Sequence, residues 1–284
     1  MNRFFALLFL VPLSHSATAI DVHGHRGARG HLPENTLPGF ERALQLGATT
    51  LELDVGVTRD GVVVVHHDRA LNPDTTRGPD GQWIAAPGLL IRELTYAQLQ
   101  RYDVGRIRPG SEYAKRFPHQ QAADGARVPR LAELLLKAAR FNIETKLSAE
   151  APHEALPPEP FARAVVAEVR KAGAAARTTI QSFDWRTLKV VEREAPEIAT
   201  AYLTGRRNAQ PEAVHAAGGR IWSPEFTTLT PQTLAAARRL GLKLVPWTVN
   251  EPADIARVLD MQVEGIISDY PDRVRAALKA RGIE

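Results

Sequence analysis

The residues best suited to chemistry lie near the beginning of the chain, in the segment 22–30. This segment leads from an apolar residue into the sequence His-Gly-His-Arg-Gly, and a glycine-rich bend follows. A helix whose apolar positions recur every three or four residues is then predicted from about residue 36. An imidazole and a guanidinium at a strand end, beside a turn and a helix start, are well placed to bind an anion. The segment therefore predicts an anion-binding site.

Three acidic residues stand inside short runs that are otherwise typical of strands. Glu52 and Asp54 alternate with leucine and valine, and Glu144 follows Ile143. A buried, unpaired carboxylate is costly, and three that converge repel one another unless a cation lies among them. Oxygen ligands alone favour calcium or magnesium over zinc. These acids therefore predict a metal site, with surface acids or acid–arginine pairs as the alternative.

Strand-like and helical runs alternate along the chain. The strand-like runs lie near 21–25, 50–57, 62–67, 141–146, 178–182, 199–203, 220–223, 243–248 and 265–268. The helical runs lie near 36–46, 131–140, 160–172, 185–194, 231–240, 251–260 and 271–281. This alternation predicts a parallel sheet covered by helices. The chain of 284 residues has the usual length of a single α/β barrel.

Nine strand-like runs are one too many for an eight-stranded barrel, so we interpret 50–67 as a hairpin. Asp60-Gly61 is a typical two-residue hairpin loop. With that loop, Asp54 lies opposite His67, and directly opposed residues share a face of the sheet. His67 is then predicted beside the acids and His66 on the other face. Eight parallel strands remain, which predicts a TIM-type (β/α)8 barrel with a small insertion after the third strand-like run.

Several short motifs, in this order, resemble the glycerophosphodiester phosphodiesterase family from about residue 21 to about residue 273. They are His25-Arg26-Gly27, Pro33-Glu34-Asn35-Thr36, Glu52-Leu53-Asp54, His67-Asp68, Ile143-Glu144-Thr145-Lys146, Ser182-Phe183, Trp247-Thr248-Val249-Asn250 and Gly265-Ile266-Ile267-Ser268-Asp269-Tyr270-Pro271. The resemblance implies a metal-dependent phosphodiesterase on a TIM-type barrel. It also implies that Glu52, Asp54 and Glu144 bind the ion.

The two histidines in the matching motifs, His25 and His67, are the candidates for acid and base. Cleavage of a phosphodiester needs both, because the leaving alkoxide must be protonated. The sequence does not assign the two roles. His23 lies on the same strand face as His25 and is a weaker candidate for the site.

Positive charge for the phosphate oxygens is expected from Arg26 and Lys146. Arginine suits a planar contact with several donors, whereas lysine acts as a point charge. The competing interpretation is a salt bridge to Glu52 or Glu144. Trp247 lies near the end of a strand, where it is predicted to form the wall of a substrate pocket, or else to pack in the core.

The segment of about 69–127 is rich in turn residues and too long for a simple connection, which predicts the small insertion. The resembling family has an inserted subdomain at this place. We expect this insertion to select the head group. Its aromatic residues are predicted to enclose a choline group by cation–π attraction; they are Trp83, Tyr96, Tyr102, Tyr113 and Phe117.

Residues 1–19 are typical of a signal peptide, with Arg3, an apolar run and the small-residue site Ala17-Thr18-Ala19. The remaining chain, 20–284, is predicted to form one barrel domain, exported to the periplasm or secreted. The apolar run is too short to span a bilayer, and no stable membrane insertion is expected. The net charge is +4, without a basic block interleaved with aromatics, so nucleic acid is not expected as a partner.

The predicted function is metal-dependent hydrolysis of a small-molecule glycerophosphodiester to glycerol 3-phosphate and an alcohol. One divalent cation, calcium or magnesium, is expected as cofactor. Two alternatives remain. A phospholipase D-like lyase that cyclises lysophospholipids would be favoured by a wide apolar mouth. A non-catalytic binding module would be favoured by the loss of a histidine or a carboxylate, and none is missing. The oligomeric state is left open.

Overall fold

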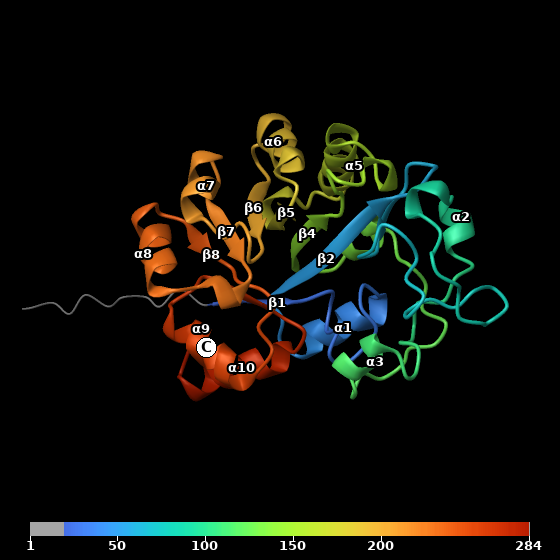
Figure 1. The fold of residues 1–284 in the computed structure, drawn as a ribbon, viewed down its shortest axis with the longest axis horizontal. Helices are drawn as coiled ribbons and strands as arrows, with labels where there is room; N and C mark the ends of the chain where they lie inside the picture. The colour runs from blue at the N-terminus through green and yellow to red at the C-terminus, as the bar shows by residue number, and fades with distance from the viewer. Residues whose placement is uncertain (1–19, 284) are drawn as a thin grey trace, which may run out of the picture.

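Eight parallel strands alternate with helices and form a nearly closed barrel (Figure 1). The computed structural model describes residues 20–283. The strands are β1 (Asp21–Gly24), β2 (Thr50–Val57), β4 (Arg140–Thr145), β5 (Thr178–Ser182), β6 (Ala199–Thr204), β7 (Ile221–Pro224), β8 (Lys243–Leu244) and β9 (Gly265–Ser268). A short strand, β3 (Val63–Val65), pairs with β2 outside this ring. The predicted TIM-type (β/α)8 barrel is confirmed.

The ring is completed between β8 and β9 by main-chain hydrogen bonds rather than by a regular ladder. The sheet order is β8-β7-β6-β5-β4-β2-β1-β9. The N–H of Glu264 donates to Leu244 O at 3.0 Å, and that of Ile267 donates to Pro246 O at 3.0 Å. The segment predicted as a strand over 243–248 therefore lies beside β9, although only its first two residues form a regular strand.

The helices surround the barrel, and most of them agree with the sequence pattern. They are α1 (Leu37–Gln45), α2 (Tyr96–Leu99), α3 (Glu112–Arg116), α4 (Leu131–Leu135), α5 (Pro158–Lys171), α6 (Trp185–Glu194), α7 (Pro211–Ala216), α8 (Pro231–Arg239), α9 (Pro252–Asp260) and α10 (Pro271–Ala280). Short 3₁₀ helices lie at Ile91–Glu93, Pro152–Glu154, Ala175–Arg177 and Phe226–Thr228. The last four helices each begin with proline, whose φ suits the first helical position.

Three helical predictions need correction. The helix expected over 131–140 ends at Leu135, because β4 begins at Arg140 and needs an extended approach. The short helices α3 and α7 were not expected. Both are too brief to show a clear helical period in the sequence.

The predicted register of the 50–67 hairpin is wrong by one residue. Val55 pairs with Val65, and the N–H of Thr58 donates to Val62 O at 3.0 Å, so the loop has three residues rather than two. Gly61 has φ +80°, as in a three-residue loop that ends with a residue in the left-handed region. Asp54 therefore lies opposite His66, whose N–H donates to Asp54 O at 3.0 Å.

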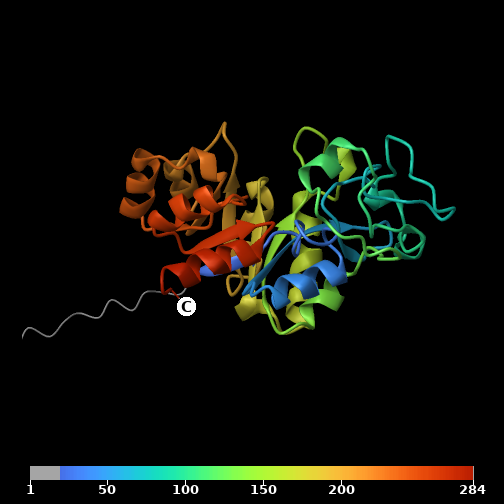
Figure 2. The ribbon, with the colours of Figure 1, turned by 90° about the horizontal axis from the view of Figure 1, so that it is seen from below.

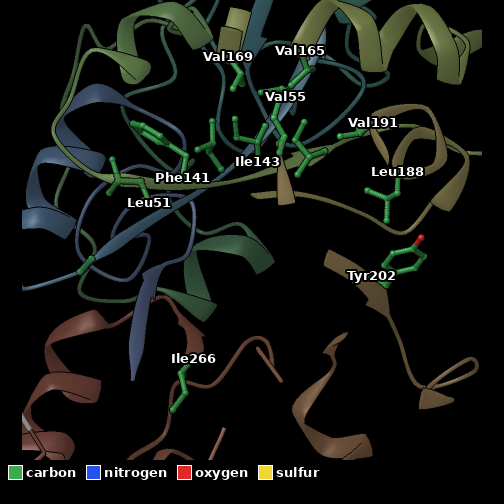
Figure 3. Close-up of a cluster of buried hydrophobic side chains, with 14 of the residues drawn as sticks. Leu51, Val55, Phe141, Ile143, Val165, Val169, Leu188, Val191, Tyr202 and Ile266 are labelled. Carbon is green, nitrogen blue, oxygen red and sulfur yellow. The ribbon is translucent and has the colours of Figure 1, made fainter. Parts of the chain in front are cut away.

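The alternation of residues in β2 divides the barrel interior from the surrounding core. Leu51 and Val55 belong to a large buried cluster with side chains of α5 and α6 (Figure 3). The acids between these apolar positions point the other way, toward the barrel axis. Asp54 is in register with Glu144 of β4, so both carboxylates lie on the inner face of the sheet.

The segment between β3 and β4 forms a folded extension on one side of the barrel (Figures 1 and 2). It has a small buried cluster of its own, separate from the main core. The cluster consists of Val64 of β3 together with Leu71, Ile91, Leu94, Leu99, Val104 and Val128 of the segment. Across residues 20–283, none of the helices combines the length and the apolar character needed to cross a bilayer.

Candidate active site

Three buried carboxylates converge at the mouth of the barrel. Glu52, Asp54 and Glu144 each offer an oxygen, and these oxygens all lie within 4.8 Å of one another. Asp54 Oδ1 is buried without a hydrogen-bond partner among the described residues. Lys146 Nζ lies 3.6 Å from this oxygen, beyond hydrogen-bond distance. A buried carboxylate oxygen without a hydrogen bond, beside two other carboxylates, is suited to ligate a cation.

The electrostatics of this cluster also fit a cation. Burial and repulsion from Asp54 and Glu144 raise the pKa of Glu52 well above its usual value. Burial also raises the pKa of Glu144, against the attraction of Lys146. The pKa of Asp54 is lowered despite burial, chiefly by Arg26. Three clustered, buried carboxylates repel one another when all are ionised, and a bound divalent ion would stabilise their ionised forms.

The predicted phosphate-binding cations lie at this mouth but pair with acids. The Arg26 guanidinium lies 3.0 Å from Glu34 Oε1 and 3.3 Å from Asp54 Oδ2. Lys146 Nζ lies 2.7 Å from Glu144 Oε1. A salt bridge to Glu52 or Glu144 is the competing interpretation, and the one between Lys146 and Glu144 is present. Arg26 reaches Glu52 only through its main-chain N–H, at 2.9 Å.

His25 follows directly after β1 and is held by a carboxylate that our sequence reasoning missed. Its Nδ1 lies 2.7 Å from Asp269 Oδ1, and its Nε2 lies 3.9 Å from Glu52 Oε2. Arg29 donates to both oxygens of Asp269. Burial, followed by the charge of Arg29, lowers the pKa of His25 to about 4. The ring is therefore neutral near pH 7. Its Nδ1 lies 3.1 Å from Arg29 Nη2, which can only donate, and 2.7 Å from the Asp269 carboxylate, which can only accept; the shorter contact favours a proton on Nδ1, facing Asp269.

Of the two adjacent histidines, only His67 lines the mouth cavity, although the hairpin register from which we predicted this is wrong. Both lie beyond the end of β3: His66 still bonds to Asp54 through its main chain, whereas His67 begins a bend, so the regular alternation of a strand no longer applies to the pair. His67 lines the mouth cavity, and its Nδ1 lies 2.6 Å from Asp68 Oδ1. His66 does not line the mouth cavity; it lines a smaller neighbouring cavity, which His67 also borders, and its Nδ1 contacts Asp68 O at 2.8 Å.

The mouth cavity, of about 400 Å³, brings together most of the predicted site residues. Those lining it are His25, Arg26, Glu52, His67, Glu144, Lys146 and Trp247. Asp54 lies beneath this surface. The cavity lies at the carboxyl-terminal end of the barrel, where barrel enzymes place their active sites. His67 reaches it from the segment after β3, outside the ring, and Glu52 from within β2.

One wall of the cavity is aromatic. The rings of Phe183 and Trp247 are perpendicular, with centroids 5.4 Å apart, and Trp247 Nε1 donates to Ser223 O at 2.9 Å. Phe183 is 43% exposed. The pair presents apolar surface to a bound substrate. His23, the weaker candidate, does not line the cavity and lies deeper in the barrel.

The predicted aromatic cage from the insertion is not assembled. Of its five members, only Tyr113 lines the mouth cavity, where its hydroxyl donates to Glu34. Trp83 and Tyr102 line a separate hollow, and Phe117 is buried beneath the Arg29 guanidinium, 4.8 Å from its ring centroid. Side chains that share one segment can face different neighbours once the segment folds back on itself.

Sequence reasoning missed Asp269, Arg29 and Gln181. The amide of Gln181 donates to Glu52 Oε1 at 2.8 Å. One signal was available for Asp269, because an acid directly after a barrel strand lies at the catalytic end. Arg29 and Gln181 carried no comparable signal.

The fold and this cavity define the class of protein. A (β/α)8 barrel with a buried acidic cluster, two histidines and two cations at its catalytic end is built to act on a phosphorylated substrate. The sequence profile of the glycerophosphoryl diester phosphodiesterase family matches residues 25–273. The chain therefore belongs to this family and is a phosphoric diester hydrolase.

Individual relatives agree with this assignment. A glycerophosphodiester phosphodiesterase of Bacillus subtilis is 31% identical, over 87% of this chain and 83% of its own length. A solved structure from Silicibacter pomeroyi, assigned to the same kind of phosphodiesterase, is 39% identical. It has a TM-score of 0.87 and covers 94% of this chain and 95% of its own.

A more distant solved structure has the same fold. It is an Oleispira antarctica phosphodiesterase in complex with sn-glycerol-3-phosphate as product. It is 23% identical, with a TM-score of 0.74, and covers 92% of this chain and 97% of its own.

Proposed function

We propose that the protein hydrolyses glycerophosphodiesters to glycerol 3-phosphate and an alcohol, with one divalent cation held by Glu52, Asp54 and Glu144. The observation that carries this proposal is the grouping of three buried carboxylates with His25 and His67 around one cavity. A bound calcium or magnesium ion would supply Lewis-acid stabilisation of the phosphoryl oxygens.

We assign the base to His25 and the acid to His67. His25 is neutral, and with its Nδ1 proton directed to Asp269 its Nε2 can accept a proton from the nucleophile. His67 lines the same cavity, and its Nδ1 lies 2.6 Å from Asp68 Oδ1, which leaves Nε2 as the atom that can face the leaving oxygen. As the bond from phosphorus to the alcohol oxygen breaks, His67 passes its proton to that oxygen. Arg26 and Lys146 orient the phosphate by exchanging part of their pairing with the acids for its oxygens.

The test is an assay of the protein on glycerophosphocholine, with calcium and with magnesium. We expect glycerol 3-phosphate and choline in equal amounts. A substrate analogue that lacks the 2-hydroxyl distinguishes direct attack by water, which it still permits, from attack by the 2-hydroxyl, which forms a cyclic phosphate first. Accumulation of cyclic product without hydrolysis would instead support the lyase alternative. The charged lining of the cavity favours hydrolysis of small polar diesters.

Head-group selection is proposed for the part of the insertion that reaches the cavity. Arg116 lines it, and its guanidinium stacks over Tyr113 and Phe117 at 5.5 and 5.7 Å from the ring centroids. No salt bridge to Arg116 occurs within residues 20–283. An unpaired guanidinium at the mouth favours substrates with an additional negative group.

Arg116→Ala should therefore lower kcat/KM for glycerophosphoserine more than for glycerophosphocholine, changing their ratio by roughly 3- to 10-fold, as expected for a partly exposed charged contact. Trp83→Ala, in the same insertion but outside the cavity, is the matched control. An unchanged ratio in the Arg116 variant would assign selectivity to the barrel loops and Trp247.

Export to the periplasm or the medium remains a proposal. It rests on residues 1–19, which lie outside the described part of the structure. Fractionation of cells that express the full chain should place the processed protein outside the cytoplasm. A chain that keeps its first residues and stays in the cytoplasm would contradict this.

A further inference from the structure

A line of polar side chains passes through the barrel interior and ends on Glu52. Asp21 Oδ2 lies 3.2 Å from His23 Nε2, and His23 Nδ1 lies 3.3 Å from Asn142 Nδ2. Asn142 Nδ2 donates to Gln181 Oε1 at 2.9 Å, and Gln181 Nε2 donates to Glu52 Oε1 at 2.8 Å. Asn142 and Gln181 are each only 1% exposed. The line connects the amino end of the barrel to the acidic cluster at its mouth.

One assignment of donors and acceptors accounts for the contacts in this line. The Asp21 carboxylate accepts from Thr50 Oγ1 and Arg140 Nη2, both at 2.8 Å. Because a carboxylate can only accept, its 3.2 Å contact with His23 Nε2 is explained by a proton on that nitrogen. His23 Nδ1 is then an acceptor, and it faces the amide nitrogen of Asn142. Because an amide nitrogen has two hydrogens, Asn142 can donate to His23 and Gln181 together.

The amide orientation of Gln181 follows from that of Asn142. With its oxygen facing the Asn142 donor, the nitrogen of Gln181 must face Glu52. The other oxygen of Glu52 accepts from the Arg26 main-chain N–H at 2.9 Å. Each oxygen thus receives one protein donor and keeps lone-pair capacity for a cation.

The amide oxygen of Asn142 lacks a partner in the described part of the chain, which indicates that the orientation of this side chain is set by its amide nitrogen. Asn142 Oδ1 is buried and has no hydrogen-bond partner among the described residues. An unpaired buried amide oxygen is unfavourable, and such a group calls for an explanation. Its amide nitrogen, by contrast, serves two partners.

We propose that Gln181 is a positioning residue that orients Glu52 toward the cation, and that Asn142 and His23 hold the Gln181 amide in the required orientation. This inference rests on the proposed cation site. Partners behind metal ligands orient those ligands, and their loss typically weakens metal affinity by roughly 10- to 100-fold.

The test measures cation affinity without substrate, by calorimetric titration of the whole protein with Mg²⁺ and, separately, Ca²⁺ at pH 8. Gln181→Met removes the donor to Glu52. Asn142→Asp replaces a donor by an acceptor, which should turn the Gln181 amide over and direct its oxygen at Glu52. Each variant should bind the ion roughly 10- to 100-fold more weakly than the unchanged protein. Ser223→Ala, which removes a buried hydroxyl of β7 whose hydrogen bond goes to Val245 O, is the control and should bind as before.

A double variant tests whether the effect passes through Gln181. In the Gln181→Met background, Asn142→Asp should cause little further loss, since coupled positions are not additive. Thermal unfolding without added ion checks that each variant folds. If Asn142→Asp does not fold, the ion affinity of Gln181→Met alone tests the positioning role. Unchanged affinity in folded Gln181→Met would overturn the inference while leaving the cation site intact. Absence of binding to the unchanged protein would remove both.

Discussion

Removing divalent ions should reduce hydrolysis of glycerophosphocholine by at least roughly 10³-fold, since a catalytic metal contributes several kcal/mol to the barrier. The physical reason lies in Glu52, Asp54 and Glu144, whose buried oxygens lie within 4.8 Å of one another. Without an ion, burial raises the pKa of Glu52 and Glu144, and the cluster cannot present three full charges. The measurement is kcat after chelation and dialysis, followed by re-addition of magnesium or calcium. Full activity in excess chelator would contradict the three-carboxylate site.

A single substitution makes the same test at one ligand. Glu144→Gln keeps the shape of the side chain but removes its charge, so it should weaken ion binding by well over roughly tenfold, because a charged ligand is lost from a buried site. Glu150→Gln changes a nearby exposed acid in the same way and serves as the matched control. Equal ion affinities for the two variants would exclude Glu144 as a ligand.

His67→Ala should lower kcat by roughly 10²- to 10⁴-fold, the usual effect of losing an acid or base group. His66→Ala should lower kcat far less. His67 lines the mouth cavity, whereas His66 lines only the smaller neighbouring cavity. Both side chains contact Asp68. A larger loss of kcat in His67→Ala than in His66→Ala would therefore reflect a catalytic role and not merely the loss of a contact with Asp68.

The comparison needs folded variants and a direct readout of the proton-transfer role. Thermal unfolding checks the fold, and a substrate with a good leaving group checks the role. If His67 protonates the leaving oxygen, the loss in His67→Ala should shrink for a p-nitrophenyl ester, which departs without a proton. A greater loss in His66→Ala, or an equal loss on both substrates, would remove His67 as the acid.

The sequence by itself determined the barrel and the acidic cluster, because both follow from local periodicity. In β2, apolar residues and acids alternate with period two, so the acids must share the face opposite to Leu51 and Val55. The carboxyl ends of parallel strands meet at one edge of the sheet. The residues that directly follow β1 and β4, including His25 and Lys146, were therefore predictable members of one mouth.

Only the tertiary structure decided how these groups are held. The 50–67 hairpin has a three-residue loop stabilised by the Thr58 and Asp60 side chains. One extra loop residue shifts every predicted pair of the hairpin by one position. The contacts of His25 with Asp269 and of Glu52 with Gln181 join residues 244 and 129 positions apart. Periodicity acts over a few residues, whereas these partners are chosen by the closure of the barrel, where strands distant in sequence become neighbours.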